Sequence, residues 1–116
     1  MLLTKKRDVV ERLCRFPLSF RNSKKTKGEY VEAAGIVKHP SALTVDSLLP
    51  YIKEHAELIG AWMVWSSDKR VSSGWYFKPA RTGGYEVGYY PPGERLEFDE
   101  IERACAEFIV RELGPP

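Results

Sequence analysis

Apolar residues in the segment 1–57 recur at helical spacing, and prolines interrupt the pattern, so this segment is predicted to be mainly helical. Thr4 can cap a helix that continues to about Arg15, because four apolar residues fall on one face of it. These residues are Val9, Val10, Leu13 and Cys14. Pro17 ends the helix, since the residue before a proline avoids the α region. The polar stretch 21–27 (RNSKKTK) then predicts a mobile loop.

Two further helices are predicted from their N-terminal residues. Thr26 and Glu29 have the spacing of a capping box, which predicts a short helix over residues 29–34. Thr44 opens another helical segment, and Pro50 inside it predicts a kink or a restart. The apolar residues of that segment expected to face inward are Leu48, Leu49, Ile52 and Ala56.

The pattern changes at residue 58, where the apolar residues become continuous or alternate. The sequence predicts three strands, over 59–66, 72–78 and 85–90. Short, turn-rich segments connect them, and this requires antiparallel pairing because parallel strands need a long crossover. We therefore expect a three-stranded meander over 58–90, which the Pro-Pro-Gly at 91–93 ends.

Residues 98–113 hold the clearest helical pattern. Asp99 and Glu102 have capping-box spacing. The apolar stripe consists of Ile101, Ala104, Cys105, Phe108, Ile109 and Leu113. Such a stripe must be buried, and one face of the meander is the nearby apolar surface. The predicted fold class is α+β, a single domain over 1–116 with N-terminal helices, a three-stranded antiparallel meander and a C-terminal helix packed on the sheet.

Aromatic residues concentrate in the predicted meander. Eight of the fourteen aromatic residues lie in residues 62–90, namely Trp62, Trp65, Trp75, Tyr76, Phe77, Tyr85, Tyr89 and Tyr90. Large rings let a small sheet bury enough area, but Tyr and Trp are also enriched at binding hot spots. Tyr76, Tyr90 and one of the paired tryptophans are the candidates for such a surface. Gly88 in mid-strand indicates a bulge or the close approach of a neighbouring ring or partner.

Length and composition narrow the class of protein. A chain of 116 residues with two cysteines suits one small domain of the reducing cytoplasm, without a disulfide framework. No apolar run approaches the roughly 20 residues that span a bilayer. The net charge of +2 hides a gradient, since residues 1–30 carry nine basic and three acidic side chains and residues 31–116 carry nine and thirteen. We expect a dipolar molecule, unless the two ends attract each other across the fold.

No motif for catalysis or cofactor binding is present in the sequence. The two histidines, His39 and His55, have no nearby Cys or His that would complete a zinc site. Neither a nucleophile elbow nor a phosphate-binding glycine pattern occurs. Cys14 and Cys105 fall on apolar helix faces, where thiols are usually inert packing groups. We therefore expect no metal, no cofactor and no enzymatic activity.

Four segments carry a resemblance to a known class of protein: Trp65–Arg70, Ser73–Phe77, Tyr85–Tyr90 and Ala104–Ile109. This half of the chain resembles small bacterial immunity proteins encoded beside polymorphic toxins, including contact-dependent growth inhibition systems. The resemblance implies a cytosolic protein that binds one cognate toxin domain, one to one, and blocks its active site or substrate path. Many immunity proteins directed at nucleases are strongly acidic, and the net charge of this chain departs from that pattern.

Two sets of residues are candidates for the contact with such a partner. One set would form a rigid patch of mixed charge with aromatic rings: Asp68, Lys69, Arg70, Tyr76, Arg81 and Tyr90. The other set would meet a cationic cleft in place of a phosphate backbone: Glu94, Glu97, Asp99 and Glu100. These acids can equally form a solvated face near a helix N-terminus.

Two other functional hypotheses stay open. A small nucleic-acid-binding domain would use the sheet aromatics and the basic N-terminal segment. Against it, the strands lack the signature of RNA-recognition sheets, and an acidic terminal helix repels phosphates. The other hypothesis is that the chain is a subunit of a larger complex or forms a homodimer through the edge of its sheet.

Overall fold

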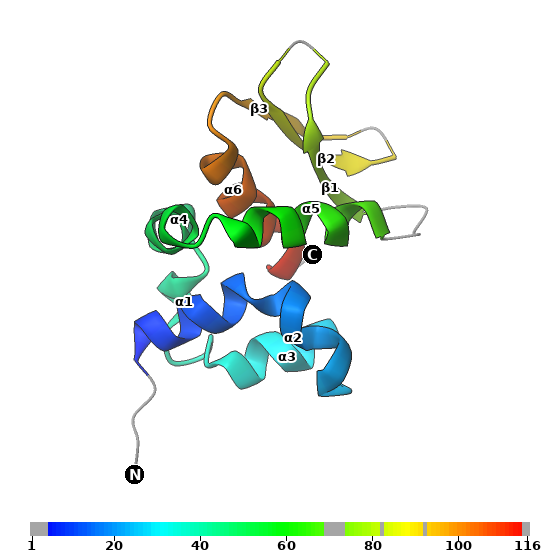
Figure 1. Ribbon diagram of the computed structural model, residues 1–116. Helices are drawn as coiled ribbons and strands as arrows, with labels where there is room; N and C mark the ends of the chain where they lie inside the picture. Colours follow the sequence, from blue (N-terminus) through cyan, green and yellow to red (C-terminus); the bar gives the residue numbers. More distant parts are fainter. Residues whose placement is uncertain (1–4, 69–73, 82, 92, 115–116) are drawn as a thin grey trace.

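Six α-helices and one three-stranded antiparallel sheet form within residues 5–68, 74–81, 83–91 and 93–114, which are the residues that the computed structural model describes (Figure 1). The helices are α1 (Lys6–Cys14), α2 (Phe16–Ser23), α3 (Lys27–Ala34), the 3-10 helix η1 (Pro40–Ala42), α4 (Val45–Glu54), α5 (Glu57–Asp68) and α6 (Ile101–Leu113). The strands are β1 (Gly74–Pro79), β2 (Tyr85–Tyr90) and β3 (Arg95–Phe98). This arrangement confirms the predicted α+β class.

The first two helices correct the prediction for the N-terminal segment. Thr4 lies outside the described residues, and the N-cap of α1 is Lys5, whose backbone N–H donates to Asp8 at 3.1 Å. α1 ends at Cys14, before Pro17, as predicted, but Pro17 then stands in the first turn of a second helix, α2, where its missing N–H costs no hydrogen bond. The predicted loop over 21–27 was therefore too long, because only residues 24–26 connect α2 to α3.

Side-chain caps set the starts of α3 and α4 as predicted. The Thr26 hydroxyl accepts from the Glu29 N–H at 3.1 Å, and Glu29 accepts from the Thr26 N–H at 2.8 Å, which completes the capping box. Thr44 likewise accepts from the Ser47 N–H at 3.2 Å. α4 continues through the exposed Pro50, so the helix does not restart there.

The strand predicted over 59–66 was wrong, because these residues belong to α5. Leu58, Ile59 and Trp62 are buried while Gly60 and Val64 are exposed, which is helical spacing. A short continuous apolar run does not distinguish a buried strand from a buried helix by periodicity. The expectation that Trp62 and Trp65 point to opposite faces of a sheet fails with it.

A three-stranded meander is present, but it begins with the second predicted strand. Its third strand, β3, follows the last predicted one. The order is β1-β2-β3, with Trp75 opposite Tyr89 and Phe77 opposite Val87. Pro91 lies in a turn between β2 and β3 and does not end the sheet. Little in the sequence indicates β3, because it has only four residues and no β-branched side chain.

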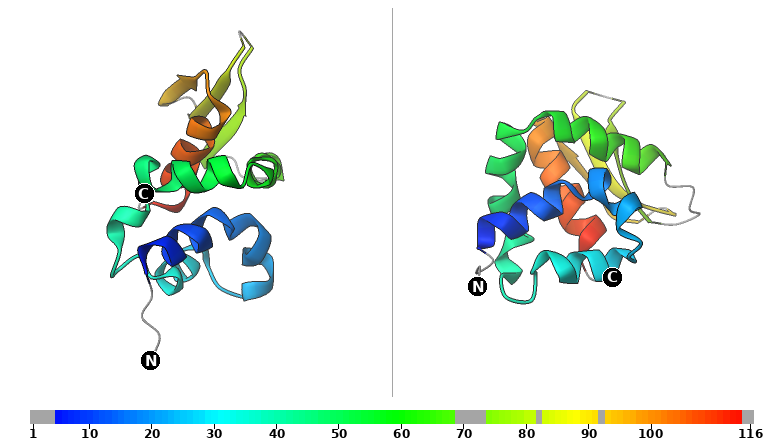
Figure 2. Two further views of the ribbon diagram at one scale, coloured as in Figure 1. Left: turned by 60° about the vertical axis from the view of Figure 1, so that its left-hand side comes forward. Right: turned by 60° about the horizontal axis from the view of Figure 1, so that its bottom comes forward.

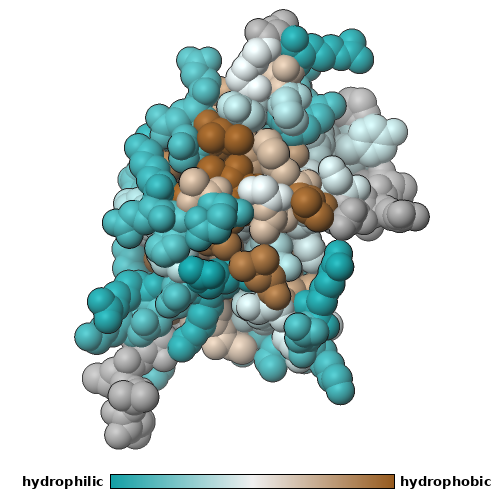
Figure 3. Space-filling model, viewed as in Figure 1, coloured by the Kyte–Doolittle hydropathy of each residue, from teal (hydrophilic) through white to brown (hydrophobic). Residues whose placement is uncertain are grey.

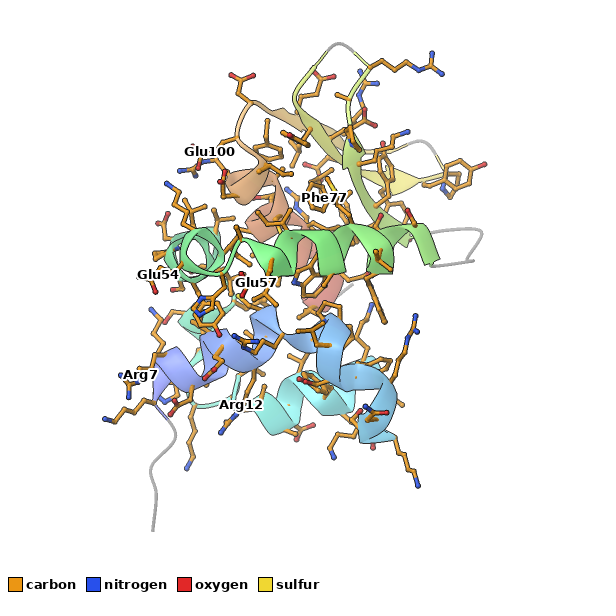
Figure 4. The ribbon with its side chains drawn as sticks, viewed as in Figure 1. Arg7, Arg12, Glu54, Glu57, Phe77 and Glu100 are labelled. Carbon is orange, nitrogen blue, oxygen red and sulfur yellow. The ribbon has the colours of Figure 1, made fainter. Side chains whose placement is uncertain are left out.

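The apolar stripe of α6 forms the centre of the core. α6 passes between the sheet and the N-terminal helices (Figure 2). Phe108 contacts the rings of both Trp62 and Phe77, with ring centroids 5.8 Å apart in each pair. The Trp62 indole N–H donates to the carbonyl of Cys14 at 2.8 Å, which ties α5 to the end of α1. Figure 4 shows Phe77 between the sheet and the helices.

The N-terminus of α6 differs from the predicted capping box. Its N-cap is Glu100, not Asp99, and no side-chain oxygen caps the first turn. Gly114 follows the last turn as predicted, and its N–H donates to the Val110 carbonyl at 2.9 Å. Among the described helices, none is long and apolar enough to cross a membrane.

A glycine substitution tests the helical assignment of α5. Gly60 is exposed, and a Cβ placed there meets nothing within 4 Å. Gly60→Ala should therefore raise the free energy of unfolding by about 0.5–1 kcal/mol, measured by urea denaturation. Gly84→Ala is the comparison that should destabilise, because Gly84 has φ +73° and its Cβ would lie 2.6 Å from the Phe98 carbonyl oxygen. A loss of stability in Gly60→Ala would contradict the helix.

Candidate functional site

A groove of about 1340 Å³ opens between α3, the last turn of α6 and the paired ends of β1 and β2. Its lining is mainly apolar and comes from distant parts of the chain. Val31 and Val37 belong to α3 and the segment after it, Trp65 belongs to α5, and Trp75 and Tyr89 come from the sheet. The rings of Trp75 and Tyr89 meet edge to face, with their centroids 5.2 Å apart.

Two of the groove residues are large hydrophobic side chains that remain exposed. Val37 is 75% exposed and Tyr89 is 39% exposed. The other exposed large hydrophobics in the described part of the chain are Leu18, Val64 and Tyr90, which do not line the groove. On the face shown in Figure 3, hydrophobic residues reach the surface in separate places among hydrophilic ones. The groove is thus where exposed apolar side chains and a concave shape coincide.

A buried carboxylate lies in the groove lining. Glu112 is only 4% exposed, and a charge in that position must be compensated. The Trp65 indole N–H donates to Glu112 Oε2 at 2.8 Å, and Lys27 Nζ lies 3.4 Å from Oε1. These bonds join α3, α5 and α6 at one point, so they hold the walls of the groove in place.

Arg111, the residue before Glu112, is held on the sheet side of the groove. Its guanidinium lies over the Trp75 ring, 4.9 Å from the centroid. It also pairs with Glu94 and, at 3.0 Å, with Glu107. The hydrogen bond to Glu94, followed by that to Glu107, raises the pKa of Arg111 above its ordinary value. Trp75 therefore has one face covered by a cation that is itself ion-paired.

The outer face of the sheet carries a second polar arrangement. The Tyr76 hydroxyl donates to the Glu86 carboxylate, and Glu86 is 8% exposed. Burial, and after it this hydrogen bond, raises the pKa of Tyr76 to about 12. Gly88 opposes Tyr76, and a Cβ at Gly88 would collide with the Tyr76 ring and hydroxyl. The mid-strand glycine thus permits the close approach of a ring, one of the two predicted reasons for it.

The patch of mixed charge predicted from the sequence is only partly described. Tyr76 lies on the outer face of the sheet, and Tyr90, at the end of β2, is 58% exposed. Arg81 is exposed in the turn after β1. Asp68 is the last residue of α5, whereas Lys69 and Arg70 lie outside the described residues.

The four predicted acids do not gather on one surface. Glu94 pairs with Arg111 on the sheet side of the groove, whereas Glu97 on β3 lies 3.8 Å from Arg95. Glu100 lies at the start of α6, 3.4 Å from Lys53 of α4 (Figure 4). Asp99 is exposed between β3 and α6. Since three of the four have a cationic neighbour within the molecule, their charge is partly compensated before any partner arrives.

Sequence patterns do not indicate most residues of the groove. They predict Trp65 on a strand and Lys27 in a loop, whereas these residues lie on the helices α5 and α3. Val37 has no periodic pattern around it that marks it as exposed. Arg111 is an ordinary charge in the last turn of a helix, and only its position against Trp75 distinguishes it.

Groups suited to covalent or metal chemistry are buried or dispersed in the described residues. Cys14 and Cys105 are both free and fully buried, as predicted. Burial raises the pKa of the Cys14 thiol to about 12 and that of Cys105 further still, so neither is a thiolate at neutral pH. Within the described ranges, no group of three His, Cys, Asp or Glu residues is placed to hold a metal ion.

Comparisons with known proteins do not indicate a functional class for this chain. No protein family, curated protein or solved structure matches this chain. The shape, polarity and charge of the surface therefore carry the functional argument.

A double-mutant cycle tests whether the buried carboxylate holds the groove together. Trp65→Phe removes the indole donor, and Glu112→Leu removes its acceptor. We expect a coupling free energy of about 1.5–3 kcal/mol between the two substitutions in urea denaturation, as for a hydrogen bond to a charged group. If the losses in unfolding free energy of the two single variants simply add in the double variant, the hydrogen bond does not contribute to stability. The cycle cancels the packing of Trp65 against Phe16 and Phe20.

The Tyr76 hydroxyl should lose its proton at a higher pH than an ordinary tyrosine hydroxyl. Since its pKa is raised from 10 to about 12, this group stabilises the fold fully below pH 10, and that contribution is lost as the pH rises toward 12. Glu86→Gln should lower the Tyr76 pKa while leaving it above 10, because burial is the larger cause. The measurement is phenolate absorbance, with Tyr76→Phe identifying the Tyr76 contribution. An unchanged Tyr76 titration in Glu86→Gln would show that the Glu86 carboxylate does not raise the pKa of Tyr76.

Proposed function

We propose that this chain acts by binding a partner protein, and that the groove receives an apolar segment of that partner. The observation that carries the proposal is the composition of the groove. It combines Trp65, Trp75, Tyr89 and Arg111, and Trp, Tyr and Arg are the residue types enriched at binding hot spots. Ring contacts and ion pairs hold several of them in place, so little side-chain entropy is lost when a partner binds.

The charges in the groove indicate an apolar occupant. Glu112 is compensated by Lys27, and Arg111 by Glu94 and Glu107. Glu32 is also in the lining, but it is exposed on α3. A charged segment would find no unpaired counter-charge at Glu112 or Arg111 and would lose its hydration there. An uncharged segment with large apolar side chains would instead cover Val37 and remove its exposed surface from water.

The partner that we propose is a bacterial toxin domain, which the chain neutralises by contact without turnover. This part of the proposal comes from the resemblance of residues 60–113 to small immunity proteins. The cysteines, with raised pKa values, and the dispersed histidines are consistent with inhibition by binding. A tight one-to-one complex would block the active site or the substrate path of the toxin domain.

The geometry favours this function over nucleic-acid binding. That alternative needs the sheet aromatics and the basic N-terminal segment to form one surface. Residues 21–27 lie on α2, α3 and their connection, whereas the sheet lies on the other side of α5 and α6 (Figures 1 and 2). Of residues 21–27, Lys27 alone lines the groove beside Trp75 and Tyr89, and it is already paired with Glu112, so the basic segment adds little uncompensated positive charge to the sheet aromatics.

A matched pair of substitutions tests both the function and the groove. The chain is co-expressed with the toxin domain encoded by the neighbouring gene, and the complex is measured by co-purification and by rescue of growth. We expect the wild-type chain and Val64→Asp to bind and rescue, because Val64 is 58% exposed outside the groove. Val37→Asp should weaken binding by at least about tenfold, since it places a charge in an apolar contact.

The outcomes separate the two parts of the proposal. Absence of both complex and rescue with the wild-type chain would overturn the immunity function. Equal binding by Val37→Asp and Val64→Asp would place the contact outside the groove. Circular dichroism of both variants shows whether the fold is retained, which we expect because both side chains are exposed.

A further inference from the structure

A small hollow lies on the opposite side of α3 from the groove. Its volume is about 160 Å³. The residues that line it come from α1, the end of α2, the α2–α3 connection and α3, namely Arg12, Ser23, Lys25, Tyr30, Ala33 and Ala34. α3 thus separates the apolar groove on one side from a small hollow on the other side that holds two cationic side chains, Arg12 and Lys25.

Hydrogen bonds hold the polar groups of the hollow in position. Arg12 Nη1 donates to the Ala34 carbonyl at 3.2 Å, which fastens the guanidinium to the last turn of α3 (Figure 4). The Tyr30 hydroxyl donates back to the Arg12 carbonyl at 3.3 Å. The Ser23 hydroxyl donates to the Phe20 carbonyl at 2.6 Å and accepts from the Lys25 N–H at 3.3 Å, which orders the connection that carries Lys25. The guanidinium keeps most of its five N–H donors for another acceptor.

The hollow is cationic and has no acid in its lining. In the described part of the chain, neither Arg12 nor Lys25 forms an ion pair. Glu29 is the acid whose pKa Lys25 helps to lower, after hydrogen bonds from Thr26. That carboxylate is already engaged in the capping box, accepting from the Thr26 N–H at 2.8 Å. Two like charges that share one small hollow favour an anion between them.

We propose that this hollow is a binding site for a phosphate monoester, held by Arg12 and Lys25, since the Ser23 and Tyr30 hydroxyls already donate to the Phe20 and Arg12 carbonyls. Two positive charges match the charge of −1.5 to −2 that a phosphoryl group carries near pH 7. Arg supplies a planar fork of donors and Lys a point charge, a combination that suits phosphate oxygens. A hollow of about 160 Å³ has room for a small anionic group such as a phosphoryl.

The site is independent of the groove, so it is tested on the isolated full-length chain. Backbone amide shifts are followed by NMR at pH 7.5 during titration with O-phosphoserine and, separately, with inorganic phosphate. Serine in sodium chloride of matched ionic strength is the control. We expect saturable shifts at Lys25, Tyr30 and Ala34 with both phosphates and none with the control.

Two neighbouring lysines provide the matched variants. Lys25 lines the hollow, whereas Lys24 next to it does not, and both are exposed. Lys25→Gln should weaken phosphate binding by roughly five- to tenfold, and Lys24→Gln should leave it nearly unchanged. Tighter binding of O-phosphoserine than of inorganic phosphate supports a phosphorylated side chain as the source, and equal binding supports free phosphate. Shifts that do not saturate, or equal losses in the two variants, would overturn the site.

Discussion

Burial of the apolar stripe of α6 is the constraint on which the rest of the fold depends. A three-stranded sheet of short strands cannot bury enough surface alone, and the N-terminal helices have no sheet of their own to cover. α6 covers the sheet and also packs against the helices, because Phe108 contacts Phe77 of the sheet and Trp62 of α5. Trp62 in turn donates to the carbonyl of Cys14, so the core also fixes the end of α1.

The helix that organises the core also positions the candidate site. Arg111 and Glu112 are consecutive residues in the last turns of α6, and they serve different walls of the groove. Arg111 covers Trp75 of the sheet, while Glu112 binds Trp65 of α5 and Lys27 of α3. The groove is therefore rigid where its anchors lie, which is the condition under which exposed apolar side chains give affinity at low entropic cost.

The charge gradient along the sequence is partly neutralised within the fold and partly presented to solvent. Lys27 and Glu112 join the basic N-terminal segment to the acidic C-terminal helix, as attraction between the two ends would require. Arg12, Lys24 and Lys25 remain exposed on the helices and connection of that segment. α3 consequently separates two surfaces of different chemistry, an apolar groove with compensated charges and a cationic hollow.

The sequence by itself determined the elements whose signals are local. The caps at Thr26 and Thr44, the strand over 85–90 and the stripe of α6 were predicted because each depends on residues a few positions apart. α5 was misassigned since its continuous apolar run suits either a strand or a buried helix, and only packing around Trp62 decides between them. The groove unites Lys27, Val37, Trp65, Trp75 and Arg111, which are far apart in the chain and share no spacing. Tertiary structure alone decided that site, because its contacts are nonlocal and leave no periodic trace in the sequence.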